Sequence, residues 1–162
     1  MLAILSFAVA NSTPQGTIGP DFALLVVGAS RPVADRLDAA VRRAGIDDMR
    51  SSFGFVIRAL ADSPQGLTEL AERLGVTKQA AIKVIDEMEA RGFLAREPHP
   101  ADRRAKILAL TDKGRRVREA ALAESRRMER ELRCALGDAD VDALRRVLVR
   151  FSGEGDGARP VW

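Results

Sequence analysis

The chain has 162 residues, of which 46% are hydrophobic and 30% are charged, a composition that suits one compact folded domain with extensions and excludes a disordered chain. One cysteine and one histidine exclude an intramolecular disulfide and a four-ligand Cys/His zinc site. The net charge of +3 is compatible with nucleic-acid binding but does not argue for it, and no apolar run reaches the length that spans a bilayer.

The first nineteen residues differ from the rest of the chain. Residues 1–10 are apolar and uncharged, and residues 11–19 are rich in turn formers. Ala8-Val-Ala10 imitates a signal-peptidase site, but the basic segment that precedes such a site in an export signal is missing. We therefore expect a flexible arm, an extension that covers a partner subunit, or a start codon assigned too far upstream. The chain is expected to be cytoplasmic.

Two helices are predicted next. Asp21 can accept hydrogen bonds from the free amide groups at the start of a helix over residues 22–44, and Gly45 is expected to end it. Pro32 lies inside this helix and is expected to bend or restart it. A second helix is predicted over residues 47–61, opened by its two aspartates and carrying an apolar stripe.

A helix-turn-helix pattern follows. A short helix capped by Thr68 ends at Gly75, which permits a sharp turn, and a second helix is predicted over residues 78–91. Ala71 is small enough to let the two helices pack closely. The same pattern occurs in helical hairpins that bind no DNA. The residues near the exposed N-terminal half of the second helix are the candidates for contacts with bases and phosphates: Thr77, Lys78, Gln79, Ile82 and Lys83.

Residues 93–97 and 104–110 predict two strands joined by a proline-defined turn. The segment from residue 96 to residue 118 carries eight basic and three acidic residues, so its net charge of +5 exceeds that of the whole chain. A basic hairpin beside a recognition helix is typical of a wing, whose arginine can enter the minor groove, whereas the alternative is a solvated turn. The wing candidates are Asp102, Arg103, Arg104 and Lys106.

A long helix is predicted from a cap at Thr111 to about Leu136, and a last amphipathic helix reaches about Phe151. Apolar residues recur in the long helix at near-heptad spacing, which suits a partner helix. Cys134 is expected to be a buried, inert thiol rather than a redox sensor. His99 is expected to be a solvent-facing turn residue without a catalytic partner.

Three stretches resemble the MarR family of winged-helix transcription regulators. They are Leu67-Thr-Glu-Leu-Ala-Glu-Arg-Leu-Gly-Val-Thr-Lys78, Asp86-Glu-Met-Glu-Ala-Arg-Gly-Phe-Leu94 and Asp102-Arg-Arg-Ala-Lys-Ile-Leu-Ala-Leu-Thr-Asp-Lys-Gly114. The resemblance covers roughly residues 22–151 and implies a mainly α fold with a small β-hairpin wing. It divides the chain into an N-terminal arm of uncertain order (1–20), a helical dimerisation region (21–46 and 112–151), a winged helix-turn-helix region (47–111) and a flexible tail (152–162).

The resemblance also implies an obligate homodimer that binds a pseudo-palindromic operator on double-stranded DNA, more often as a repressor than as an activator. In the family, an aspartate and an arginine at the positions of Asp102 and Arg104 act together, the first orienting the second in the minor groove. Many members release DNA when a small, often phenolic, molecule binds between the dimerisation and DNA-binding parts. Arg31 and Phe53 are the pocket residues expected by this analogy, and no cofactor, metal or membrane partner is expected.

The chain departs from the family in its recognition helix. Gln79, Ala80 and Ile82 occupy positions where members often have serine or threonine, which leaves the operator sequence open. A ligand-binding or protein-interaction dimer that has lost DNA binding is the alternative function. An enzyme is not expected, because the sequence offers no paired-carboxylate cleft, no glycine-rich phosphate loop and no catalytic triad.

Overall fold

The computed structural model describes residues 21–102 and 104–151, which form six helices and one antiparallel β-hairpin. The elements in chain order are α1 (Phe22–Arg43), α2 (Ser51–Leu60), α3 (Leu67–Leu74), α4 (Lys78–Ala90), β1 (Leu94–Pro98), β2 (Lys106–Leu110), α5 (Asp112–Leu136) and α6 (Asp138–Phe151). The predicted mainly α fold with a small hairpin is confirmed. The predicted N-terminal arm, Arg103 and the C-terminal tail lie outside the described residues. Within the described part of the chain, no helix is both long and apolar enough to cross a membrane.

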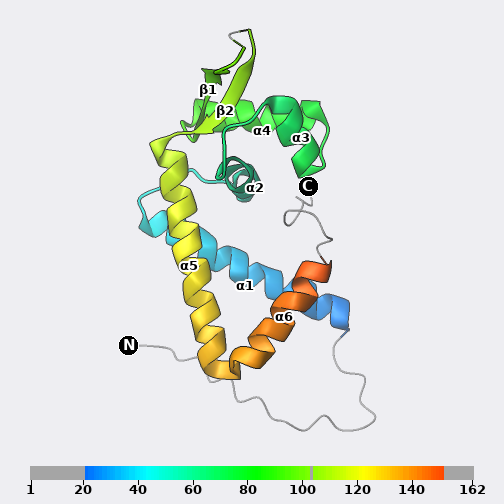
Figure 1. The fold of residues 1–162 in the computed structure, drawn as a ribbon. Helices are drawn as coiled ribbons and strands as arrows, with labels where there is room; N and C mark the ends of the chain where they lie inside the picture. Colours follow the sequence, from blue (N-terminus) through cyan, green and yellow to red (C-terminus); the bar gives the residue numbers. More distant parts are fainter. Residues whose placement is uncertain (1–20, 103, 152–162) are drawn as a thin grey trace.

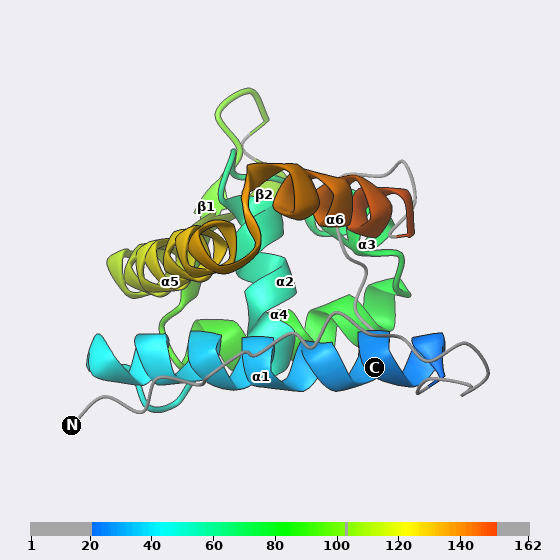
Figure 2. The same ribbon diagram turned by 90° about the horizontal axis from the view of Figure 1, so that it is seen from below.

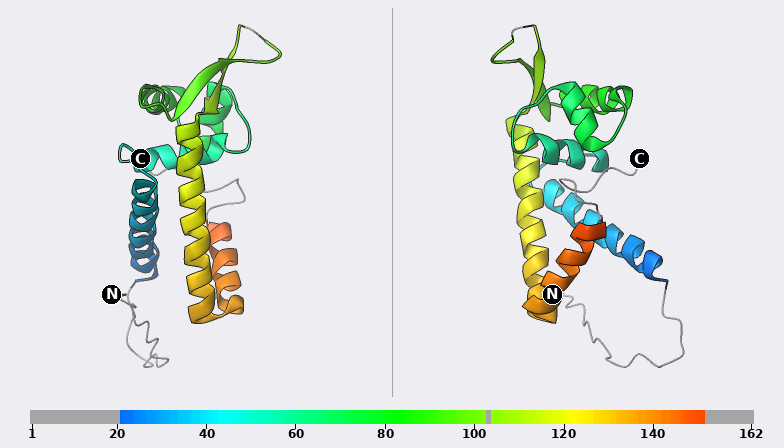
Figure 3. Two further views of the ribbon diagram at one scale, coloured as in Figure 1. Left: turned by 90° about the vertical axis from the view of Figure 1, so that its left-hand side faces the viewer. Right: turned by 45° about the vertical axis from the view of Figure 1, so that its right-hand side comes forward.

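The molecule has two ends connected by α5. The helices α2, α3 and α4 and the hairpin gather at one end, and α6 lies at the other (Figure 1). Both views in Figure 3 show α5 running from the hairpin to α6, and α5 packs against α1 along the way. We call the end formed by α2, α3, α4, β1 and β2 the wing lobe.

The helix α1 starts as predicted, because the Asp21 carboxylate accepts a hydrogen bond from the Ala23 amide at 2.9 Å. The predicted restart at Pro32 is wrong, since α1 continues through this residue as one helix (Figure 2). A proline removes one main-chain hydrogen bond, and the bonds on either side keep the helix intact here. Gly45 follows the helix with a φ of +77°, and this left-handed conformation is typical of a glycine that ends a helix.

Two predicted helix starts are wrong, and long-range contacts explain both. The helix α2 begins at Ser51 and not at the aspartates, because the Asp48 carboxylate is bound by Lys113 of α5 at 2.7 Å and does not cap a helix. The helix α3 has Gly66 rather than Thr68 as its N-cap. The preceding residue, Gln65, exchanges two main-chain hydrogen bonds with Leu108 of β2, which fixes the chain just before the helix.

The helix-turn-helix forms as predicted. Gly75 adopts a φ of +68° after α3, and the Thr77 hydroxyl accepts a hydrogen bond from the Ala80 amide at the start of α4. The hairpin pairs Leu94 with Leu110 and Pro98 with Lys106, so both strands are slightly displaced from their predicted ranges.

The core lies in the wing lobe. Phe53 of α2 meets Phe93 edge-on, with ring centroids 5.4 Å apart, and both side chains are fully buried. Val117 of α5 is 2% exposed and belongs to the same core, so this apolar residue of the long helix packs within its own chain. Cys134, near the end of α5, is exposed in the single chain, contrary to the expectation of a buried thiol. It lies far along α5 from the wing-lobe core, which ends near the first turns of this helix.

Candidate nucleic-acid interface

The N-terminal half of α4 presents polar side chains to solvent. Thr77, Lys78, Gln79 and Lys83 are exposed, whereas the opposite face of the helix is buried in the wing lobe. Ile82 is half-buried, so it offers less surface than the sequence suggested. The free amide groups of a helix N-terminus carry partial positive charge that favours a phosphate. This half of α4 can therefore meet both base edges and the phosphate backbone.

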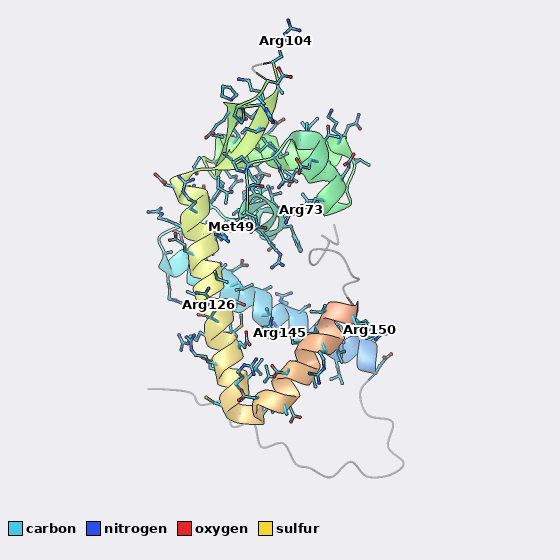
Figure 4. All side chains as sticks on the ribbon, in the orientation of Figure 1. Met49, Arg73, Arg104, Arg126, Arg145 and Arg150 are labelled. Atoms are coloured by element: carbon cyan, nitrogen blue, oxygen red, sulfur yellow. The ribbon has the colours of Figure 1, made fainter. Side chains whose placement is uncertain are left out.

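The wing tip carries an exposed arginine on a well-bonded turn. The Asp102 carboxylate accepts a hydrogen bond from the main-chain amide of Arg104 at 2.9 Å, and the His99 ring accepts one from Ala101. His99 is partly exposed at the base of this turn. The Arg104 side chain points away from the hairpin at its tip (Figure 4). Asp102 thus shapes the turn through the main-chain amide of Arg104.

Ion pairs reduce the basic excess of this part of the chain. Arg96 turns back onto α4 and pairs with Asp86 and Glu89, and the hydrogen bond that Arg96 donates to Asp86 holds the pKa of Arg96 above its usual value. Lys113 and Arg115 also pair with aspartates. Fewer basic side chains are therefore available to bind a polyanion than the charge count of the sequence suggested. Among the described residues between 96 and 118, the basic residues that form no ion pair with a described residue are Arg104, Lys106, Arg116 and Arg118.

A cavity of about 570 Å³ lies between α1, α2 and α5. The two pocket residues expected by analogy do not line it. Arg31 is 85% exposed and faces Asp35 one turn away, and Phe53 is fully buried in the core. Sequence periodicity missed the lining residues because the cavity depends on how three distant helices pack. Its walls include Leu37, Val41, Met49, Phe55, Ala121 and Leu122, together with the charged Asp38, Arg58 and Arg118.

Known proteins are similar in sequence to this chain, and the similarity includes the helix-turn-helix and the wing. The model of the MarR family matches residues 55–105, which run from α2 to the wing turn. The transcriptional regulator HosA of Escherichia coli is 38% identical over 69 residues, which are 41% of this chain and 50% of HosA. An uncharacterized protein of Mycobacterium bovis is 29% identical over 103 residues, covering 61% of this chain and 72% of that protein.

Solved structures share the whole arrangement. The transcriptional repressor CouR, bound to a 23-mer DNA duplex, has a TM-score of 0.65 and 27% identity, covering 87% of this chain and 99% of CouR. A MarR-family regulator from Rhodococcus sp. RHA1 has a TM-score of 0.62 at 21% identity, covering 85% and 98%, which supports the fold. The helix-turn-helix, the wing and the matched segment agree with one another. The segment from α2 to the wing turn is therefore similar to the MarR family of transcriptional regulators, and the whole chain shares the fold of a solved regulator of that family.

Proposed function

We propose that the chain is a homodimeric, sequence-specific DNA-binding repressor that reads a pseudo-palindromic operator. The observation that carries this proposal is the placement of two exposed polar surfaces at one end of the molecule, the N-terminal half of α4 and the wing tip (Figure 1). Lys78, Lys83 and Arg104 form no ion pair with any described residue, so their charges are available to phosphates. The similarity to CouR, which was solved bound to DNA, supports the same use of this end.

Each surface has a distinct part in the proposed complex. The N-terminal half of α4 lies in the major groove, where Gln79 can bond an adenine edge and Lys78 or Lys83 a guanine or a phosphate. Arg104 of the wing reaches the adjacent minor groove, whose negative potential is strongest where it narrows. Thr77 precedes Lys78 at the start of α4, and Lys106 begins β2, two residues after Arg104. Base contacts then come from α4 and positioning contacts from the wing.

Apolar surfaces support the proposed dimer. In the single chain, large hydrophobic side chains are exposed on α1, on the C-terminal half of α5 and on α6, away from the wing lobe. Large hydrophobic side chains exposed in this number favour an interaction site, and a two-fold dimer would place two copies of α4 one helical turn of DNA apart. The exposed residues are Leu24, Leu25, Val26, Val27, Val33, Leu132, Leu136, Leu144, Val147, Leu148, Val149 and Phe151.

The cavity supports a small-molecule effector that releases DNA. Its walls are mostly apolar, and three arginines line it: Arg73 pairs with Asp62, whereas Arg58 and Arg118 form no ion pair with a described residue. This chemistry suits an aromatic ring that carries an acid group, with bidentate pairing from an arginine. CouR from Rhodococcus jostii RHA1 has been solved bound to p-coumaroyl-CoA, which is also an anionic aromatic compound. An effector here would sit between α1, α2 and α5 and would alter how the wing lobe meets α5.

Selection of binding sites from random DNA duplexes tests the proposal. We expect a two-fold symmetric consensus, with affinity that falls steeply as salt rises because several phosphates are neutralised in each complex. A scrambled duplex of the same composition is the control. No enrichment by protein that is folded and dimeric would contradict the proposal and would favour the alternative of a ligand-binding or protein-interaction dimer.

A further inference from the structure

Three successive main-chain carbonyl groups follow the recognition helix α4, and each accepts a hydrogen bond from a residue at the start of α5. Lys113 Nζ donates to the Arg91 carbonyl at 2.9 Å, the Thr111 hydroxyl donates to the Gly92 carbonyl at 2.6 Å, and the Thr111 amide donates to the Phe93 carbonyl at 3.1 Å. We call these five residues the α4–α5 joint. Every main-chain carbonyl between the end of α4 and the start of β1 is thus tied to the first turn of α5.

Lys113 connects the joint to a third segment. Its ammonium group donates to the Asp48 carboxylate at 2.7 Å, in the connection between α1 and α2. The same nitrogen lies 4.1 Å from the centroid of the Phe93 ring, a cation–π distance. One side chain of intermediate exposure therefore joins the α1–α2 connection, the end of α4 and the start of the wing.

The main chain of α5 also approaches this segment closely. A Cβ atom on Gly114 would lie 2.2 Å from the Phe93 carbonyl oxygen and 3.2 Å from Leu110 Cδ2. Gly114 is buried, so no water-filled gap separates α5 from the carbonyl. A contact this close allows little variation in the angle between α5 and the wing lobe.

We propose that Lys113 is a positioning residue for DNA binding, which fixes the orientation of α4 on α5 and thereby the separation of the two recognition helices in the dimer. The inference rests on the proposed function, since it needs a dimer held by α1, α5 and α6 that reads two half-sites. A change of angle at the joint moves the far end of α4. The distance between the two recognition helices then no longer matches the distance between the two half-sites, whereas the contacts within one half-site change less.

A purely stabilising role predicts a different result from a positioning role. Loss of stability alone lowers the fraction of active protein, so affinity falls by the same factor for every operator. Loss of positioning lowers the preference for the correct spacing over spacings that are wrong by one base pair. The informative quantity is therefore the ratio of affinities between the selected operator and operators lengthened or shortened by one base pair at the centre.

The ion pair between Lys113 of the joint and Asp48 of the α1–α2 connection allows a test that separates geometry from charge. Lys113→Gln removes a positive charge and Asp48→Asn removes a negative one, so their general effects on attraction to DNA have opposite signs. The positioning role predicts that both lower the spacing ratio, by roughly fivefold or more. Lys113→Arg keeps the charge and the donors and should retain most of the ratio. Arg130→Gln removes an exposed charge from α5 far from the joint and should leave the ratio unchanged.

The experiment measures affinity of the full chain for the three operators, after circular dichroism and sedimentation have shown each variant to be folded and dimeric. An unchanged ratio in both Lys113→Gln and Asp48→Asn, or an equal loss in Arg130→Gln, overturns the positioning role. If Lys113→Gln does not fold, the ratio measured for Asp48→Asn decides. Failure of the wild-type chain to select any operator is a separate result, which overturns the proposed function.

Discussion

The Glu124 carboxylate of α5 accepts a hydrogen bond from Nε of Arg36 in α1 at 2.8 Å, although Glu124 is only 7% exposed. Arg43, farther along α1, donates to the other oxygen of the same carboxylate at 3.2 Å. Arg36 also pairs with Glu131, and this hydrogen bond together with that to Glu124 raises the pKa of Arg36. A buried acid thus links two turns of α1 to α5.

Replacing Glu124 with Gln should destabilise the fold. The amide keeps the shape of the side chain but leaves two arginines without the buried negative charge that they share, and both arginines are partly hydrated, so we expect a loss of about 1–3 kcal/mol. Urea unfolding measures the free energy. Glu119→Gln, an exposed change on the same helix, is the matched control and should have little effect. Equal stabilities of the two variants would contradict the role assigned to Glu124.

Gly114→Ala should be more damaging than an ordinary glycine substitution. The new methyl group would overlap the Phe93 carbonyl oxygen, so α5 must move away from the wing lobe, at a cost of about 3 kcal/mol or more. Gly54→Ala in α2 is the control, because a Cβ atom at Gly54 would meet no neighbouring atom within 4 Å and helix propensity favours alanine there. Thermal unfolding of both variants checks the difference, and a stable Gly114→Ala variant would contradict the close approach.

Local chemistry made much of the fold predictable. The caps at Asp21, Thr77 and Thr111 each use a side chain that bonds an amide two or three residues away, and Gly75 supplies a left-handed residue between α3 and α4. Such signals need no knowledge of the rest of the chain. The starts of α2 and α3 were predicted wrongly because partners distant in the sequence decide them, including Lys113, which is 65 residues from Asp48.

The same division applies to the candidate sites. The exposed face of α4 follows from the helical spacing of its buried residues, so Lys78, Gln79 and Lys83 were found from sequence. The cavity was not, because its walls come from α1, α2 and α5 and no sequence period relates Leu37 to Ala121. Phe53 has the chemistry of a pocket residue, but packing against Phe93 places it in the core.

Arg104→Ala should weaken operator binding by a few kcal/mol per dimer at most, since one groove contact is lost in each half-site. The fold should be unchanged, because the side chain is exposed and the Asp102 contact uses the main-chain amide. Fluorescence anisotropy with the selected operator measures the loss. Arg42→Ala removes an exposed charge at the end of α1 and serves as the control. A binding curve that Arg104→Ala leaves unchanged would contradict the wing assignment.

Acid should weaken the Asp48–Lys113 pair. The hydrogen bond from Lys113 holds the pKa of Asp48 below its usual 3.8, so the folded protein favours the ionised carboxylate. The resulting stabilisation is present above that usual value and is lost as pH falls through the lowered pKa. Wild type should therefore be more stable than Asp48→Asn at neutral pH, and the difference should shrink as pH falls below about 4. Urea unfolding across this pH range checks the trend, and a constant difference would contradict it.

Filling the cavity should separate effector response from DNA binding. Ala121 lines the cavity on α5 and lies between the cationic Arg118 and the apolar Leu122, so Ala121→Phe would occupy space that an aromatic effector needs. DNA binding should persist, because the cavity is distinct from the exposed residues of α4 and the wing. The measurement is the release of bound operator by aromatic carboxylates such as benzoate and cinnamate. At least one compound of this class should release the operator from wild type but not from Ala121→Phe. The exposed change Ala123→Ser on the same helix is the control and should preserve the release. Equal release from wild type and Ala121→Phe would place the effector elsewhere.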